Sequence, residues 1–485
     1  MLTTDVRARS DRDTSALWPW GVVGSVGAIG VAVTATTIGS RPRPPGYHWW
    51  LYVPSAGYTL AHLLFYASVA LLTAGWLGVG VRARCGRLTV ADSWRLLVLW
   101  GAPLWLATPL FSRDIYSYVA QGELVRHGFN PYVVTPSALG AGPVLSSIAV
   151  VWRDTTSPYG PLFVMLSHLT SLVTSQSLIA QVLAFRALEL VGVALLMLAL
   201  PAVARHFGAD GAVAVWLGVL SPLALFSAVS SAHNDTLMIG LMMVALLAAV
   251  RESRYWALAL FSLAATIKLP AVAGIIFVTV AALRHASPRR RARLVGEALV
   301  IPAVVIAGVT ELAGNGWRWL APSALSIPTQ LRVLTTPVVS IAKLAATSLR
   351  AVGLQVANAT VVTAAQHVAE LLAVIAVAAL ATRTRRDNVA RHLGVALLVV
   401  VIASPTVWPW YFLWGVTVLA VTSAQRSLFL AGVGALAMLL VGPGGTPMIG
   451  GNGFYVSGPL VLAGIVWFFA CGQWRRVVDG VDRVE

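Results

Sequence analysis

The chain is short of charge and has almost no lysine or cysteine. Only 11% of its 485 residues are charged and 58% are hydrophobic, whereas soluble domains carry about 25% charged residues. This composition excludes an ordinary soluble protein and indicates a polytopic membrane protein. The two cysteines, Cys85 and Cys471, give no basis for a disulfide framework or a thiolate metal site. The polar N-terminal residues do not resemble a cleavable signal peptide, so the first apolar run is expected to remain as a helix.

Apolar runs recur along the whole chain and predict an all-α bundle. Several are shorter than the ~20 residues that a straight span needs, and the runs 255–267 and 270–283 fit either one kinked helix or a tight hairpin at Pro270. We expect one integral membrane domain over residues 1–485 with about 12–14 transmembrane helices. The runs are 18–38, 59–81, 94–111, 178–202, 211–229, 235–250, 255–267, 270–283, 294–313, 357–382, 393–404, 410–422, 427–442 and 456–472.

The basic residues set the orientation of this bundle. The net charge of +16 comes mainly from arginines in short loops between the apolar runs, so it does not imply a nucleic-acid partner. Alternating the runs from a cytoplasmic N-terminus places most basic residues on one side, as cytoplasmic loops require. Both termini are then cytoplasmic, and the long loops 112–177 and 314–356 lie outside the plasma membrane. Short interfacial helices are expected in both loops, with 160–175 the clearest candidate.

The most informative acid is Asp114, where the run 94–111 meets the first long loop. A carboxylate at the lip of a membrane-spanning helix costs roughly 2–3 kcal/mol unless something offsets it, so this position indicates function. The alternative is that Arg113 and Asp114 form a pair that merely ends the helix. The polar residues that follow it in the loop are Tyr116, Tyr118 and Gln121.

Two other predicted outer segments carry candidate binding residues. Asp154 and Tyr159 belong to a polar stretch of the first long loop, where a salt bridge between Arg153 and Asp154 is an equal alternative. Trp410 and Tyr411 fit an interfacial aromatic belt, although such rings also stack on sugar faces. With Tyr116, Tyr118 and Gln121, these residues are candidates for an acceptor or loop pocket.

The predicted outer turn 230–234 leads into a third polar cluster, His233, Asn234 and Asp235. These residues fit a helix cap as well as a ligand pocket, because Asn and Asp begin helices well and an apolar run follows. Lys268 is one of only two lysines and lies at a predicted span boundary. An ammonium there either meets a lipid phosphate or simply snorkels to the headgroups.

Charges inside the spans are few. Arg186 and Glu189 lie one turn apart in the run 178–202 and are expected to neutralise each other. A lipid or glycan transporter (a flippase) would need a cavity accessible from both faces and charges near the bilayer midplane. Because the polar clusters gather on one face instead, the pattern favours an enzyme.

Physically, these residues suit the transfer of a sugar from a lipid phosphate. A lipid donor arrives sideways from the bilayer, which explains a site at helix ends. The acceptor hydroxyl needs one general base, a role for Asp114, and the leaving phosphate needs fixed positive charge from Lys268 and an arginine such as Arg113. No cofactor is expected, and a divalent metal is not needed; His233 with Asp235 is only a weak metal pair.

Five stretches of the sequence resemble the actinobacterial polyprenyl-phosphomannose-dependent α-(1→6)-mannopyranosyltransferases. These are multi-span enzymes of the GT-C class that build the α-1,6-mannan backbone of lipomannan and lipoarabinomannan. The first and third stretches are specific, whereas the His-Asn-Asp motif is shared more loosely among lipid-phosphosugar transferases. The matching stretches are Phe111–Gly122, Gly128–Tyr132, Ser157–Pro161, His233–Met238 and Pro409–Tyr411.

The resemblance implies a fold, a reaction and roles for the site residues. It implies a GT-C bundle that transfers mannose from polyprenyl-phosphate-mannose to the 6-hydroxyl of a mannolipid acceptor, a lipomannan precursor, with inversion on the extracytoplasmic face. Asp114 would deprotonate that hydroxyl, and Lys268 would bind the phosphate. The resemblance places His233, Asn234 and Asp235 in the pocket for the donor sugar or phosphate.

One rival within the enzyme class remains open. A transferase for arabinofuranose or another sugar could use a related polyprenyl donor. The absence of a soluble C-terminal sugar-binding domain in this sequence weakens the arabinan-polymerase alternative without excluding it. The sequence leaves open whether the enzyme initiates, extends or completes the mannan, and it leaves the oligomeric state open.

Overall fold

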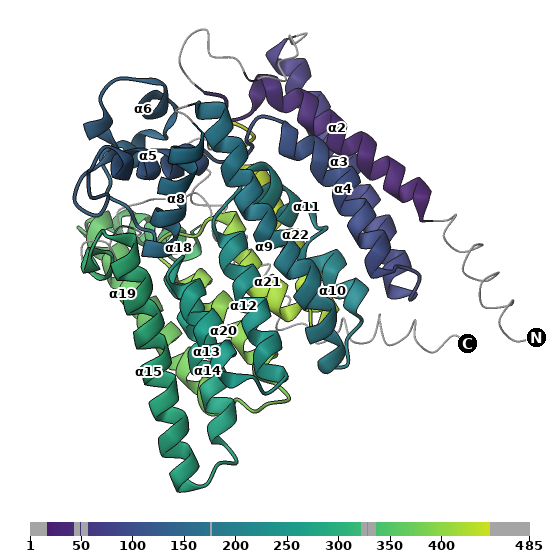
Figure 1. Cartoon of the computed structure of the whole chain (residues 1–485). Coiled ribbons are helices and arrows are strands. Elements are labelled where there is room, and N and C mark those ends of the chain that lie inside the picture. The colour runs from purple at the N-terminus through teal and green to yellow at the C-terminus, as the bar shows by residue number, and fades with distance from the viewer. Residues whose placement is uncertain are drawn as a thin grey trace, which may run out of the picture.

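In the computed structural model, all regular secondary structure of the described residues is helical, as the sequence predicts. No strand occurs within the described residues, which are 17–42, 49, 57–174, 177–321, 327 and 336–446. The long helices form one bundle around a single large apolar core. The helices α5, α6 and α8 cover one end of this bundle, and the turn between α14 and α15 lies at the opposite end (Figure 1).

The bundle is built from helices that follow the predicted apolar runs. Each of the thirteen runs that falls within the described part of the chain is mainly helical, although α4 ends at Leu106, before the predicted end of the run 94–111; the run 456–472 lies outside the described residues. The bundle helices are α2 Trp18–Ile38, α3 Tyr58–Arg84, α4 Val90–Leu106, α9 Leu178–His206, α10 Gly211–Gly218, α12 Asp235–Val250, α13 Arg254–Ala265, α14 Val272–Leu283, α15 Pro288–Ala313, α19 Asn358–Thr382, α20 Val389–Ala403, α21 Phe412–Leu419 and α22 Ala424–Val441. One further helix, α18 Pro337–Ala351, lies within the second predicted outer loop, 314–356.

Short elements lie between these helices. The first long loop folds into several of them, including a helix at the predicted interfacial run 160–175. The short elements are α5 Asp114–Arg126, η1 Pro136–Leu139, α6 Pro143–Ser147, α7 Val150–Arg153, α8 Pro161–Val173, α11 Pro222–Ala224, the π-helix η2 Leu225–Ser230, η3 Leu269–Ala271, η4 Trp317–Leu320 and η5 Pro409–Tyr411.

Within the described residues, fewer helices can cross a membrane alone than the number of apolar runs. Six of them, α2, α3, α9, α15, α19 and α22, are long and apolar enough, and a seventh span arises if α10 and the segment 222–230, bent by 50°, count as one. Several other bundle helices are shorter because the chain leaves the helical conformation at the end of the bundle that α5, α6 and α8 cover. There Pro109 follows α4, and 3-10 turns open α14 and α21. The same breaks put polar residues at helix ends.

The segment around Lys268 is a hairpin, which settles the alternative that the sequence leaves open. A Cβ on Gly274 would lie 2.0 Å from the ring of Phe261. These residues are thirteen positions apart and would be about 20 Å apart along a continuous helix. The helices α13 and α14 therefore pack against each other, and Lys268 lies at the tip of their turn.

The helices α9 and α12 make a close backbone contact next to Asp235. A Cβ on Gly192 of α9 would lie 2.6 Å from the backbone nitrogen of Leu237 in α12. Only glycine permits this approach, because any side chain would push the two backbones apart. The contact fixes the first turn of α12 against α9, and that turn carries Asp235.

Candidate active site

Segments that are far apart in the sequence meet at the end of the bundle that α5 covers. The segment 107–114 leads into α5, and the segment 230–235 leads into α12. They are joined by a hydrogen bond from the Ser231 hydroxyl to the Leu110 carbonyl. The hairpin tip at Lys268 and the turn at Trp410 reach the same place through Asp235 and His233, respectively. Loops that the sequence predicts on one side of the membrane thus build a single site.

Both segments contain a strained residue. Phe111 has a φ of 60° and Ala232 a φ of 51°, and Glu252 is the only other non-glycine residue with a positive φ in the described part of the chain. Such a conformation costs of order 1–3 kcal/mol and persists only where packing over-determines it. Phe111 and Ala232 precede Asp114 and His233 by three residues and one residue, so the turns aim these two side chains.

Asp114 is the first residue of α5 and is almost fully buried. The indole Nε1 of Trp152 donates to its Oδ1 at 3.0 Å, and its Oδ2 lies 3.7 Å from Nδ1 of His233. Burial raises the pKa of Asp114 to about 6, against the opposing effects of the Lys268 charge and the Trp152 hydrogen bond. The helix α4 ends at Leu106, so the alternative that Arg113 and Asp114 merely end it is wrong.

His233 is fully buried and lies flat on an aromatic stack. Its ring centroid is 3.7 Å from that of Trp410 at an interplanar angle of 16°, and Trp410 stacks in turn on Trp408 at 4.9 Å. Neither ring nitrogen of His233 has a hydrogen-bond partner. Burial and the Lys268 charge hold the pKa of His233 well below its usual range, so the ring is neutral at pH 7. A neutral imidazole offers one donor and one acceptor.

The surroundings of Asp235 contradict two alternatives from the sequence, namely that Lys268 snorkels to the headgroups and that His233, Asn234 and Asp235 only cap a helix. Its Oδ1 accepts from Lys268 Nζ at 2.8 Å and from Trp414 Nε1 at 2.5 Å. Lys268 therefore does not snorkel to headgroups; its Nζ lies 4.4 Å from the ring centroid of Tyr411. Asn234 occupies the N-cap position of α12 without a side-chain capping bond, so the cap interpretation is wrong.

Several atoms of this cluster are buried without a partner. They are both polar side-chain atoms of Asn234, Oδ2 of Asp235 and both ring nitrogens of His233. An unpaired buried polar group costs about 1–3 kcal/mol, and such groups call for a specific explanation. A polar ligand that enters the site would satisfy them.

The other predicted residues lie in the cover formed by the first long loop. Arg113 donates to the carbonyls of Ser147 at 2.8 Å and Arg41 at 2.5 Å. The Tyr116 hydroxyl donates to the Ser40 carbonyl at 2.6 Å. These two side chains tie the loop to its neighbours.

Tyr118 and Tyr159 form part of a buried aromatic cluster. Their ring centroids lie 5.2 Å apart, edge to face, and both rings pack on Phe163. Gln121 is buried with its Oε1 unpartnered. Asp154 is exposed and accepts from the Ser137 hydroxyl at 2.6 Å, and no ion pair with Arg153 is found among the described residues. Of these residues, Asp154 is the one that the structure places on the surface.

Two contact residues were missed as site residues, and one interpretation of buried charges is wrong. Trp152 and Trp414 bind the two site carboxylates through their indole nitrogens, but no spacing in the sequence links residues 38 and 179 positions apart. Arg186 and Glu189 do not neutralise each other. Arg186 donates to backbone carbonyls, and Glu189 accepts from the backbone nitrogen of Leu237 at 2.9 Å.

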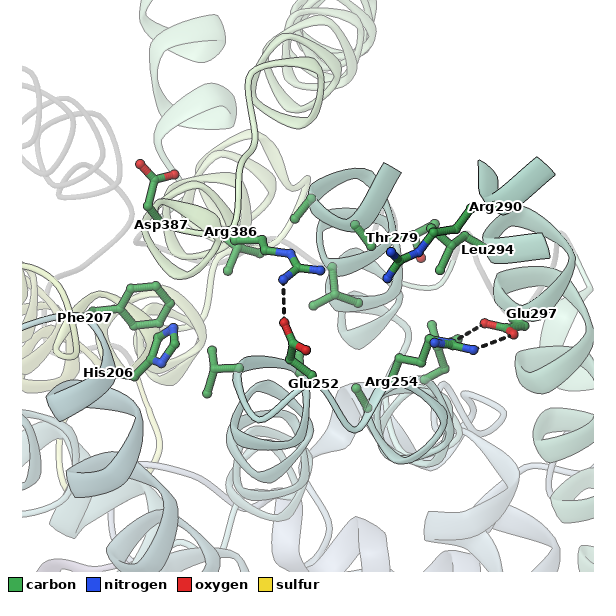
Figure 2. A pocket seen from close by; sticks show the side chains of 18 residues that line it. His206, Phe207, Glu252, Arg254, Thr279, Arg290, Leu294, Glu297, Arg386 and Asp387 are labelled. Carbon is green, nitrogen blue, oxygen red and sulfur yellow. Dashed lines mark hydrogen bonds and ion pairs between the residues drawn. The ribbon is translucent and has the colours of Figure 1, made fainter. Parts of the chain in front are cut away.

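A large cavity lies at the opposite end of the bundle and does not contain this chemistry. It has a volume of about 570 Å³ and is lined by the ends of α9, α12 and α14 and the start of α15. Figure 2 shows that Arg254 and Arg386 in its lining face acids: Arg254 pairs with Glu297 and Arg386 with Glu252, both at 2.5 Å. No group of three or more potential metal ligands occurs in the part of the chain that the structure describes.

Comparison with known proteins gives the family. A family model described as "Alpha-(1->6)-mannopyranosyltransferase, N-terminal domain" matches residues 21–284, and one described as "MptB C-terminal domain" matches residues 336–471. Alpha-(1->6)-mannopyranosyltransferase A of Mycobacterium tuberculosis is 32% identical over 404 residues, which cover 80% of this chain and 77% of that protein.

Alpha-(1->6)-mannopyranosyltransferase B of Corynebacterium glutamicum is 30% identical over 481 residues, which cover 89% of this chain and 79% of that protein. No solved structure matches the chain. The relatives of type A and type B are similar to it to almost the same degree. The chain belongs to the α-(1→6)-mannopyranosyltransferase family, as the resemblance of its motifs predicted.

Proposed function

We propose that the protein transfers mannose from polyprenyl-phosphate-mannose to the 6-hydroxyl of an α-1,6-mannan acceptor, with inversion, on the extracytoplasmic side of the plasma membrane. The observation that carries the proposal is the buried, hydrogen-bonded Asp114 beside the unpartnered His233. The family names the sugar and the linkage in the relatives. The site supplies a base and unsatisfied polar groups for a sugar phosphate.

In the proposed reaction, Asp114 is the general base. The acceptor hydroxyl oxygen attacks the anomeric carbon of mannose and its proton passes to Asp114, while the bond from that carbon to the phosphate oxygen breaks and its electron pair leaves with the polyprenyl phosphate. A base with a pKa of about 6 is mostly ionised at pH 7 and more basic than an ordinary aspartate. Efficient proton transfer favours such a value near the working pH.

The unpartnered atoms next to Asp114 suit the donor. His233 and Asn234 would bind mannose hydroxyls or donate to phosphate oxygens, and the free Oδ2 of Asp235 would accept from a mannose hydroxyl. In the described structure the ammonium of Lys268 makes one hydrogen bond, to Asp235, and an ammonium has three donors. We therefore assign the phosphate to Lys268. Arg113 donates to backbone carbonyls and would shape the loop beside the phosphate.

A lateral groove supports a lipid donor. It lies between α4 and α9, has a volume of about 460 Å³ and is lined almost entirely by apolar side chains. At one end it is lined by Trp105 and Leu106, the last two residues of α4, and the segment to Asp114 begins there. Trp105 Nε1 is buried without a partner. The groove suits a prenyl chain whose phosphate points toward the site.

For the acceptor, the aromatic residues are the best candidates. Trp408 and Trp410 stack beside His233, and aromatic faces bind the apolar faces of sugars. Gln121 has a buried unpartnered oxygen that suits a mannose hydroxyl. Tyr118 and Tyr159 would form the apolar wall of this pocket.

The decisive test uses membranes that contain wild type, Asp114→Asn or Asp387→Asn, supplied with polyprenyl-phosphate-mannose and a short α-1,6-mannoside. We expect Asp114→Asn to lose about 10²–10⁴-fold in rate, the usual contribution of a general base. Asp387, exposed at the other end of the bundle, is the matched control and should leave the rate unchanged. Linkage analysis of the wild-type product should show a new α-1,6-mannosyl bond.

Other results would refute specific parts of the proposal. Transfer of arabinofuranose but not mannose would refute the sugar assignment. Retention of more than a tenth of the rate in Asp114→Asn would refute the role of the base. Movement of a lipid-linked glycan across vesicles without any new glycosidic bond would indicate a transporter.

A further inference from the structure

Arg186 is fully buried in α9, and the proposed reaction gives it no task. We propose that Arg186, together with Glu189, is a positioning residue that fixes the segment carrying Asp114 relative to the segment carrying His233. This inference rests on the proposed function, because it takes these two side chains as the reacting site.

The guanidinium of Arg186 binds backbone carbonyls from both segments. Its Nη1 donates to the carbonyl of Trp105 and, at 2.6 Å, to that of Ala107. Its Nε and Nη2 both donate to the Ser230 carbonyl, at 2.9 and 2.6 Å. One side chain thus makes four hydrogen bonds. Two of them reach residues 79 and 81 positions earlier in the sequence, and the other two reach a residue 44 positions later.

These carbonyls have a physical need for a cation. Trp105 and Ala107 lie at the C-terminal end of α4, and Ser230 is the last residue of η2. Carbonyls at helix C-termini lack intrahelical partners and carry partial negative charge. The planar fork of an arginine has five donors in fixed directions, so it can bridge two such ends at once, which a lysine cannot.

The two bound ends lead directly to the site. The chain reaches Asp114 seven residues after Ala107 and reaches His233 three residues after Ser230. Fixing both ends therefore fixes the 3.7 Å separation between the Asp114 carboxylate and the His233 ring.

Glu189 acts in the same way one turn further along α9. Its Oε2 accepts from the backbone nitrogen of Leu237 at 2.9 Å, in the first turn of α12 that begins with Asp235. The first turn of a helix has unpaired N–H groups that need an acceptor oxygen. The two charges that the sequence suggested as a pair instead serve opposite helix ends, and together they place three parts of the site.

The test compares Arg186→Lys and Arg186→Met with Arg205→Met, an exposed arginine at the end of the same helix. Glu189→Gln and Glu189→Leu form a second pair, since Gln keeps an acceptor oxygen and Leu does not. Purified, monodisperse protein is assayed for kcat, donor KM and the pH profile of kcat/KM. Hydrogen exchange is followed at residues 107–113 and 228–234, with α19 as the internal reference.

We expect Arg186→Met to lower kcat by about 10- to 100-fold, since misplacing a reacting group by 1 Å costs about that much. Arg186→Lys should fall between it and wild type. Donor KM should stay within about twofold, because the guanidinium of Arg186 is bound to backbone carbonyls and the proposal gives it no substrate contact. The acidic limb of the pH profile should move as the surroundings of Asp114 change. Exchange should rise in both segments but not in α19. Glu189→Gln should resemble wild type, and Glu189→Leu should lower kcat.

Three results would overturn the inference. One is an unchanged kcat in both Arg186→Lys and Glu189→Leu. Another is a rise in donor KM alone, which would make Arg186 a substrate ligand. The third is unchanged exchange in both segments in Arg186→Lys. If Arg186→Met fails to fold, Arg186→Lys and the Glu189 pair decide. If wild type transfers no mannose, the proposed function fails by itself, and the exchange measurement still decides whether Arg186 positions the two segments.

Discussion

The hydrogen bond from Trp152 to Asp114 gives the sharpest prediction about the base. Its indole nitrogen lies 3.0 Å from Oδ1 and favours the ionised carboxylate, which lowers a pKa that burial raises to about 6. A hydrogen bond to a charged group is worth about 1.5–3 kcal/mol, and one pKa unit corresponds to about 1.4 kcal/mol. Trp152→Phe should therefore raise the pKa of Asp114 by about one to two units.

The assay is the pH profile of kcat/KM for mannose transfer between pH 5 and 9. With the wild-type pKa, about nine-tenths of the protein carries an ionised base at pH 7. In Trp152→Phe the acidic limb should move up by about one to two pH units, so activity at pH 7 falls about 2- to 10-fold and recovers toward pH 9. The matched control is Trp317→Phe, since Trp317 donates to the Glu311 carboxylate at 2.9 Å on the exposed surface. An acidic limb that stays in place or moves down would refute the reasoning.

The remaining predictions concern stability and the lipid groove. Because the pKa of Asp114 is raised, the protonated carboxyl favours folding at low pH, and this contribution is lost as the pH rises through about 6. Asp114→Asn should therefore raise the free energy of unfolding at pH 7.5 by up to about 3 kcal/mol and raise the melting temperature with it; a lower melting temperature contradicts this. Lys268→Met removes the counter-charge of the buried Asp235 and should cost about 3–5 kcal/mol of stability. Adding Asp235→Asn should restore thermal stability without restoring activity; a double variant as unstable as Lys268→Met contradicts the pairing. Ala102→Trp fills the groove and should raise KM for a long-chain polyprenyl donor by about tenfold, but it should leave KM for a ten-carbon donor unchanged. The control Leu99→Trp, on the same helix outside the groove, should change KM for neither donor.

The helices and the outline of the site could be predicted from the sequence because both follow local signals. Apolar runs give helices wherever hydrogen-bonded backbone is the only option in a bilayer, and the runs at 18–38 and 235–250 match α2 and α12 residue for residue. Polar residues at the ends of such runs point to one face of the bundle. Asp114, His233 and Trp410 were named on that basis, and the structure brings them together.

What the sequence does not contain is the choice of partner. Lys268 is compatible with a headgroup, a phosphate or a carboxylate, and the structure selects Asp235, 33 residues away. The rule that opposite charges one turn apart attract each other applies to exposed helix surfaces, where water would otherwise solvate both. It fails for Arg186 and Glu189 because, within the bundle, helix ends offer stronger unsatisfied partners on either side.

Arg186 and Glu189 bind the ends of neighbouring helices instead of each other for a reason that applies to the whole bundle. Broken helices expose carbonyls at one end and N–H groups at the other, and each break needs a charge of matching sign from a neighbouring helix. A long continuous helix such as α9 passes several breaks and can supply both signs one turn apart. Charges within an unbroken membrane helix at such a spacing therefore indicate which neighbouring helices are interrupted. In this chain the interruptions lie beside Asp114 and Asp235, so the two buried charges point to the same site as the acids at the helix lips.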